Sequence, residues 1–178
     1  QDIMIGYVKQ LVTNRKRQLE LDDELSTDFS YSVATLGRFR VNVSISRGSF
    51  VIVIRAIPFE IPTIEDLKLP QILKKLTKHQ NGIILVTGAT GSGKSTTVAS
   101  MLDYINTNSM RNIITFEEPI EYLHRDKNSI LSQKEIPDDV KDYTTALKYV
   151  LRQDPDIIFL GELRDQQTIE AAIKASET

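Results

Sequence analysis

The amino-acid sequence predicts a small α+β domain over residues 1–57 and an α/β domain with a mostly parallel sheet over residues 67–178. Apolar residues first recur at helical spacing and then alternate with polar ones, which is typical of a helix followed by half-buried strands. After residue 82 the strand-sized apolar runs are continuous, as expected where helices cover both faces of a sheet. Pro58 and Pro62 separate the two patterns, so residues 58–66 are predicted to be a linker.

The first domain is expected to begin with a helix. Apolar residues are spaced three and four apart over residues 3–12, and the basic run at residues 14–17 would end this helix at the negative pole of its dipole. Residues 28–35 are a candidate strand, and residues 38–45 alternate between apolar and polar side chains. A return strand over residues 49–55 would complete an antiparallel sheet.

The second domain is predicted as alternating strands and helices, with a longer excursion after its second strand. The expected strands are residues 83–87, 112–116 and 157–160. The expected helices are residues 67–76, 94–105, 143–152 and 166–176.

Composition excludes several classes of function. The 178 residues are 40% hydrophobic and 26% charged, which is enough apolar material for a core. There is no cysteine and no apolar run long enough to span a bilayer, and the net charge of −2 indicates no nucleic-acid partner. Without a visible signal peptide we expect a cytosolic protein. The chain starts at Gln1 rather than Met, so we expect a segment of a longer protein.

A glycine-rich segment after the first strand of the second domain matches the phosphate-binding pattern G-x-x-x-x-G-K-[ST]. Its glycines let backbone N–H groups point inward at the start of a helix, where they bind anions. Lys94 would reach the β- and γ-phosphates of ATP, and the Ser95 hydroxyl would ligate Mg²⁺. The predicted phosphate-binding residues are Gly88, Ala89, Thr90, Gly91, Ser92, Gly93, Lys94, Ser95 and Thr96.

Acidic residues follow the two later strands. Glu117, Glu118 and Glu121 come after one strand and Glu162 after the other, and parallel strands end at a common edge. A carboxylate there would hold the shell of Mg²⁺ or orient water for attack on the γ-phosphate. The sequence leaves open which of the first three acids orients water. Asp165 is expected to cap the last helix instead.

These motifs resemble a known family. Residues 151–165, LRQDPDIIFLGELRD, resemble the atypical Walker B segment of the type II and type IV secretion ATPases, and residues 114–121, ITFEEPIE, resemble their Asp box. Together with residues 88–97 they occur in the family's order. Residues 36–42 and 53–58 are similar to the N-terminal domain of the pilus-retraction branch, which powers twitching motility.

The resemblance implies a PAS-like domain followed by a RecA-like ATPase domain, in a homohexamer on the cytoplasmic side of the inner membrane that acts on a pilus or secretion platform protein. It implies that Glu162 acts in the Mg²⁺ site, that Lys94 and an Asp-box glutamate are catalytic, and that arginines of the first domain reach the nucleotide. The matching arginines are Arg38, Arg40 and Arg55. By the strand pattern alone, these arginines would be a solvated strand face.

The chain also departs from the family. Glu118 stands where the family usually has aspartate. The resemblance further implies that the chain lacks the family's His box, its C-terminal helices and the first part of the PAS-like domain. An assembly switch that binds nucleotide without turnover is the alternative function. A small-molecule kinase is disfavoured, because no arginine-rich lid follows the phosphate loop.

Overall fold

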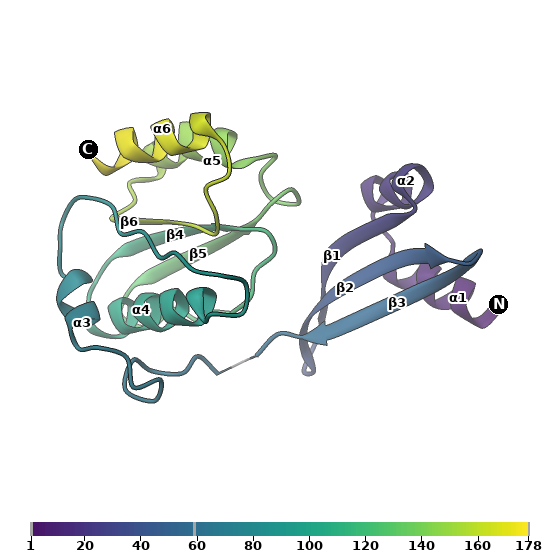
Figure 1. Ribbon diagram of the computed structural model, residues 1–178, viewed down its shortest axis with the longest axis horizontal. Coiled ribbons are helices and arrows are strands. Elements are labelled where there is room, and N and C mark those ends of the chain that lie inside the picture. Colours follow the sequence, from purple (N-terminus) through teal and green to yellow (C-terminus); the bar gives the residue numbers. More distant parts are fainter. Residues whose placement is uncertain (1, 59, 178) are drawn as a thin grey trace. The chain divides into compact units, whose positions relative to one another are not determined.

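The computed structural model describes residues 2–58 and 60–177. Gln1 and Thr178, the outer limits of the two expected domains, and Phe59 of the expected linker lie outside the described residues. The chain divides into two compact units, residues 1–57 and 58–178 (Figure 1).

The first unit contains two helices and a three-stranded antiparallel sheet in the order β1-β2-β3. Its elements are α1 (Asp2–Leu11), α2 (Arg15–Glu24), β1 (Ser26–Val33), β2 (Gly37–Ser46) and β3 (Ser49–Ala56). The antiparallel strands expected from the alternating pattern are therefore confirmed, with slightly different ends.

The basic run at residues 14–17 does not end the first helix as expected. The backbone of Asn14 is extended, and its side chain accepts a hydrogen bond from the backbone N–H of Lys16 at 2.9 Å. An asparagine in this position caps a helix N-terminus, because it satisfies an N–H that has no partner within the helix. The expectation was wrong because this cap begins a second helix, α2, at Arg15.

The two faces of this sheet differ in character. Val41 and Val43 of β2 and Phe29 of β1 form a buried cluster with Val8 and with α2. Side chains alternate along a strand, so the other face carries the polar residues between them. The alternation predicted over residues 38–45 therefore reflects packing: the apolar side chains lie on the sheet face that the helices cover.

The second unit is an α/β fold whose three-stranded sheet is parallel, in the order β5-β4-β6. Its elements are α3 (Ile72–Leu76), α4 (Lys94–Asn108), β4 (Asn112–Glu117), β5 (Ile130–Glu135), α5 (Tyr143–Val150), the 3₁₀ helix η1 (Leu151–Gln153), β6 (Ile157–Leu160) and α6 (Gln166–Ser176). The predicted fold class, α/β with a parallel sheet, is confirmed.

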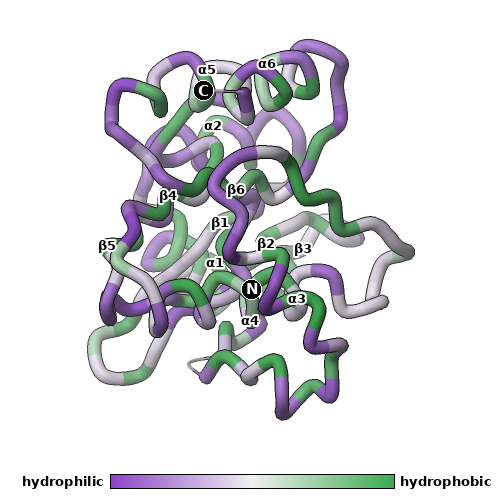
Figure 2. The backbone as a smooth tube through the Cα atoms, turned by 90° about the vertical axis from the view of Figure 1, so that its left-hand side faces the viewer, coloured by the Kyte–Doolittle hydropathy of each residue, from purple (hydrophilic) through white to green (hydrophobic). Residues whose placement is uncertain are grey.

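Helices cover both faces of the parallel sheet (Figure 1). On one face Ile113 of β4 packs against Leu102 and Ile105 of α4. On the other face Phe116 of β4 packs in a cluster that includes α5 and Ala172 of α6. Hydrophobic and hydrophilic residues alternate along α5 and α6, as expected for helices with one face on a sheet (Figure 2).

Two predictions about this sheet are wrong. Residues 83–87 form no strand with any described strand, and the side chains of Ile83, Ile84 and Leu85 are exposed. None of the described strands pairs with this apolar run: β4 pairs with β5 and β6, and neither β5 nor β6 pairs with residues 83–87. The second error concerns β5, a strand over residues that the sequence assigns to the excursion after the second strand. Among the described strands, β5 pairs only with β4, and most of its side chains are half-buried. A strand in such a place can mix apolar and polar residues, as the sequence ILSQKE does.

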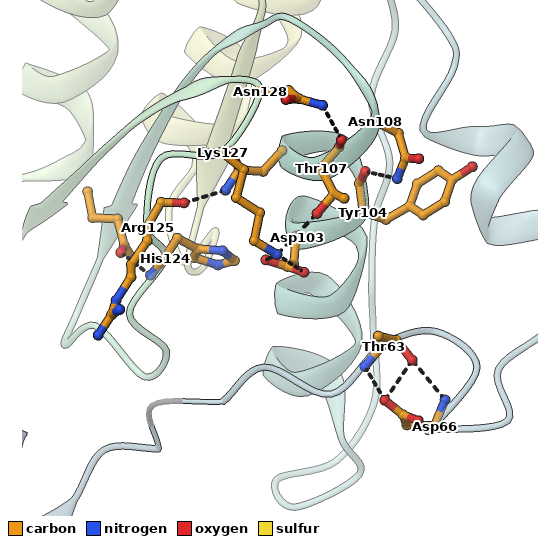
Figure 3. Close-up of polar contacts among 12 residues, drawn as sticks. Thr63, Asp66, Asp103, Tyr104, Thr107, Asn108, His124, Arg125, Lys127 and Asn128 are labelled. Carbon is orange, nitrogen blue, oxygen red and sulfur yellow. Dashed lines mark hydrogen bonds and ion pairs between the residues drawn. The ribbon is translucent and has the colours of Figure 1, made fainter.

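Residues 125–129 are tied to α4 by polar contacts. Asn106 of α4 is fully buried; its side-chain amide donates to the Arg125 carbonyl at 2.7 Å and accepts from the Lys127 N–H at 3.2 Å. The Lys127 ammonium also contacts both carboxylate oxygens of Asp103 at 2.8 Å (Figure 3). These contacts hold the segment between β4 and β5 against the helix. Among the described helices, none is both long and apolar enough to cross a bilayer.

Candidate active site

The glycine-rich segment folds into a loop at the N-terminus of α4. Gly91 and Gly93 have φ of 79° and 90°, a region that side chains with a Cβ rarely adopt. At Gly88, where φ is 157°, a Cβ would in addition lie 2.7 Å from the Ser92 hydroxyl oxygen. The glycines of the motif therefore occupy positions where the backbone conformation or a close contact requires them.

Lys94 points back into this loop. Its ammonium group donates to the carbonyls of Gly88 and Ala89, at 2.9 Å in each case. The loop is thus folded around a positive charge, while the first N–H groups of α4 lie at the positive end of the helix dipole. A cation inside a curled backbone at a helix N-terminus fits the phosphate chain of a nucleotide.

The buried end of β4 supplies a carboxylate on the same face as α4. Ile113 packs on α4, and alternation along the strand puts the side chains of Thr115 and Glu117 on that face as well. The side chain of Glu117 accepts hydrogen bonds from the Thr115 hydroxyl at 2.7 Å and the Gln133 amide at 3.0 Å. Burial raises the pKa of Glu117, and these two hydrogen bonds oppose the rise by stabilising the carboxylate.

The three acids of the first cluster differ in burial. Glu117 is 8% exposed, whereas Glu118 and Glu121 are exposed. A general base needs a fixed position and a water-poor surrounding to be effective. Of the three candidates, Glu117 has both properties.

A hydrogen bond joins the start of α4 to the segment that follows Glu117. The hydroxyl groups of Thr96 and Tyr122 lie 2.9 Å apart. Thr96 stands two residues after Lys94, so the phosphate loop and the carboxyl end of β4 belong to one local arrangement.

The end of β6 approaches the end of β4 closely. The Gly161 N–H donates to the Phe116 carbonyl at 2.8 Å, and a Cβ on Gly161 would lie 3.2 Å from the Tyr143 hydroxyl and 3.4 Å from the Glu117 Cα. The two acidic clusters therefore meet at one edge of the sheet, as the sequence predicts. Glu162, the next residue, is half-buried and forms an ion pair with Arg164 at 2.7 Å.

Tyr143 and Asp165 lie near Glu162. Burial accounts for the raised pKa of Tyr143, and helix capping accounts for Asp165. Burial raises the pKa of the Tyr143 hydroxyl, and the nearby carboxylates of Glu162 and Glu118 add to the effect. Asp165 accepts a hydrogen bond from the Thr168 N–H at 2.8 Å and begins α6. Its predicted role as a helix cap is confirmed.

The three arginines of the first unit share the sheet face opposite the helices. Arg40 pairs directly with Arg55 in the register of β2 and β3, and Arg38 lies two residues before Arg40. Arg40 lies 3.7 Å from Asp28 of β1, and both side chains are about half exposed. Arg55 is exposed, whereas Arg38 and Arg40 are half-buried, so the solvated face that the strand pattern alone predicts is found only in part. A role of these arginines toward a nucleotide stays a prediction.

Sequence reasoning missed Thr115, Tyr122 and Gln133. Thr115 lies inside a predicted strand, where a buried threonine carries no special signal. Gln133 lies on β5, which was not predicted, and its partners are 11 and 16 residues away. Such contacts are set by tertiary structure, and a local pattern does not reveal them.

Comparison with known proteins gives a consistent result. The family model described as "Type II/IV secretion system protein" matches residues 39–178. The chain belongs to the type II/IV secretion system protein family. It is 42% identical to the type IV pilus retraction ATPase PilT of Pseudomonas aeruginosa over 167 residues, which cover 94% of this chain and 48% of that protein. The family resemblance inferred from the motifs is confirmed.

Two further members of this family extend the comparison. A twitching motility protein of Neisseria gonorrhoeae is 40% identical over 98% of this chain and 46% of its own length. A solved structure of the pilus retraction motor PilT with bound ADP superposes with a TM-score of 0.91 and 46% identity, over 97% of this chain and 50% of that one. The chain thus spans about half the length of the relatives it matches.

Proposed function

We propose that the protein containing this chain is an ATP-hydrolysing motor subunit that powers pilus retraction, or a related pilus-assembly or secretion step. The observation that carries the proposal is the phosphate loop around Lys94, joined through Thr96 and Tyr122 to the segment after the buried Glu117. The relatives support it, because those named above are a pilus retraction ATPase and a twitching motility protein.

Within this proposal the loop residues from Gly88 to Thr96 bind the phosphates of ATP, with Lys94 moving from the loop carbonyls to the β- and γ-phosphates. Ser95 and Glu162 would hold Mg²⁺, whose charge would polarise the γ-phosphate. Glu117 would accept the proton of the attacking water. Glu118 is exposed and is the weaker candidate for that task.

We extend the proposal to the assembly. The first unit would be a PAS-like domain and the second a RecA-like domain, in a homohexamer that lies at the cytoplasmic face of the inner membrane and acts on a platform protein. Arg38, Arg40 and Arg55 would contact the nucleotide. Their common position on one sheet face supports this role, since three positive charges on one face can meet the phosphates of a single ligand.

Phosphate release by the full-length protein tests the enzymatic part. We expect Lys94→Ala to lose nucleotide binding, and Glu117→Gln and Glu162→Gln to lower kcat by about 10²–10⁴-fold while still binding ADP. Glu170→Gln, on the exposed side of α6, is the matched control and should turn over normally. Unchanged turnover in all the site variants would refute hydrolysis at this site. Binding by the wild-type protein without phosphate release would favour the assembly switch.

Retraction itself is tested in the host. A deletion strain complemented with the Glu162→Gln protein should extend pili and fail to retract them, as seen by live fluorescence of labelled pili. Normal retraction in that strain would contradict the motor role.

A further inference from the structure

Gln133 of β5 contacts three groups of the candidate site. Its Nε2 donates to the Glu117 carboxylate at 3.0 Å and to the Tyr122 carbonyl at 2.8 Å, and its Oε1 accepts the backbone N–H of His124 at 2.8 Å. One side-chain amide therefore fixes both the buried carboxylate and the segment that leaves it. An amide with three bonds has little rotational freedom left.

Thr115 completes the support of Glu117 from within β4. Its hydroxyl and the Gln133 amide both donate to the same carboxylate oxygen, Oε1. In the register of the parallel sheet Thr115 lies directly beside Gln133. The backbone N–H of Glu121 also donates to this carboxylate, so the directions of both oxygens, Oε1 and Oε2, are fixed.

The same contacts continue to the phosphate loop. Tyr122, whose carbonyl Gln133 holds, uses its hydroxyl to contact Thr96 in the first turn of α4 at 2.9 Å. A chain of hydrogen bonds thus runs from Thr96 through Tyr122 and Gln133 to Glu117. It links the carboxylate to the element that would bind the phosphates.

We propose that Gln133 and Thr115 are positioning residues for hydrolysis, which hold Glu117 with Oε2 directed to take the proton from the attacking water. This inference rests on the proposed function, since it assumes that Glu117 is the base. A misplacement of about 1 Å at a reacting group costs on the order of 10²-fold in rate. Loss of either donor should therefore lower kcat more than it changes the KM for ATP.

Substitutions at Thr115 separate positioning from packing. Thr115→Val keeps the shape of the buried side chain and removes the hydroxyl, whereas Thr115→Ser keeps the hydroxyl and removes a methyl group. If the residue only packs, the valine variant should be the better enzyme, because deleting a buried methyl leaves a cavity. If it positions Glu117, the serine variant should be better. We expect Thr115→Ser to stay within about threefold of wild type and Thr115→Val to lose about 10-fold in kcat.

Gln133→Met tests the second donor in the same full-length protein. Methionine has similar length and cannot donate, so we expect kcat to fall about 10–100-fold with the KM for ATP within about threefold. Gln18→Met is the matched control, because Gln18 lies on α2 of the first unit, where its side-chain amide likewise donates to a backbone carbonyl, that of Val12 at 2.9 Å. It should turn over like wild type.

The outcomes distinguish this inference from the function on which it rests. Wild-type kcat in both Gln133→Met and Thr115→Val, with Glu117→Gln inactive, would overturn the positioning role and leave the function standing. A valine variant more active than the serine variant would also overturn it. Full turnover by Glu117→Gln would instead refute the assignment of the base, whatever the other variants do. Melting temperatures measured alongside exclude loss of folded protein as the cause.

Discussion

Acid should loosen the segment between β4 and β5, because it contains a half-buried histidine, His124. The backbone N–H of His124 is held by Gln133, while its ring nitrogen Nδ1 is buried and has no hydrogen-bond partner among the described residues. Burial lowers the pKa of His124 from 6.5 to about 4. Asp103 opposes this shift and Lys127 adds to it, and burial outweighs both.

The effect of pH on closure of this segment follows from the linkage between proton binding by His124 and opening. Between pH 6.5 and about pH 4 the opened segment binds a proton that the closed segment does not, so closure weakens as the pH falls through this window. The difference between the two pKa values weakens closure of the segment by about 2 kcal/mol at pH 5 and by about 0.2 kcal/mol at pH 7. The larger cost, at pH 5, lowers protection against opening about 30-fold.

Hydrogen exchange of the peptide over residues 120–128 measures this opening. After correction for intrinsic exchange rates, protection in the full-length protein should fall about 20-fold between pH 7 and pH 5. The variant His124→Phe fills the same space without a titratable ring, and its protection should change far less. Equal changes in the two proteins, or an imidazole that titrates near pH 6.5 by NMR, would refute the reasoning.

Three smaller predictions concern backbone contacts and caps. Gly161→Ala should destabilise the protein by about 1–3 kcal/mol, because its Cβ would lie 3.2 Å from the Tyr143 hydroxyl, and adding Tyr143→Phe should recover part of the loss in thermal unfolding. Asp165→Ala should cost about 1 kcal/mol by removing the cap of α6, whereas Asp165→Asn should cost little. Gly88→Ala should weaken nucleotide binding in calorimetry, since its Cβ would lie 2.7 Å from the Ser92 hydroxyl; an affinity equal to wild type would contradict this.

The parts of the fold that were predictable have local causes. The strands at residues 112–116 and 157–160 were found because both faces are covered, which makes their sequences continuously apolar. The loop that begins at Gly88 was found because its glycines and lysine stand at fixed spacing in the sequence. Asp165 was recognised because a cap and its helix are neighbours in the chain.

The parts that were missed depend on partners distant in the sequence or on a choice between two local signals. β5 is half-polar, and only its pairing with β4 makes it a strand. The run at residues 14–17 fits both the end of one helix and the start of another, and the side chain of Asn14 decides for the start. The apolar residues 83–87 indicate a strand, but a strand also requires a neighbour with which to pair, and no described strand pairs with them.

The hydrogen bonds between Lys94 and its own loop affect how a substitution of Lys94 is interpreted. The ammonium bridges two carbonyls of its own loop, those of Gly88 and Ala89. Removing it would leave those carbonyls facing each other with no intervening charge, so the loop should spread before any ligand arrives. An alanine variant at this position therefore reports on the resting shape of the loop as well as on its chemistry, and a comparison of ligand-free spectra would separate the two contributions.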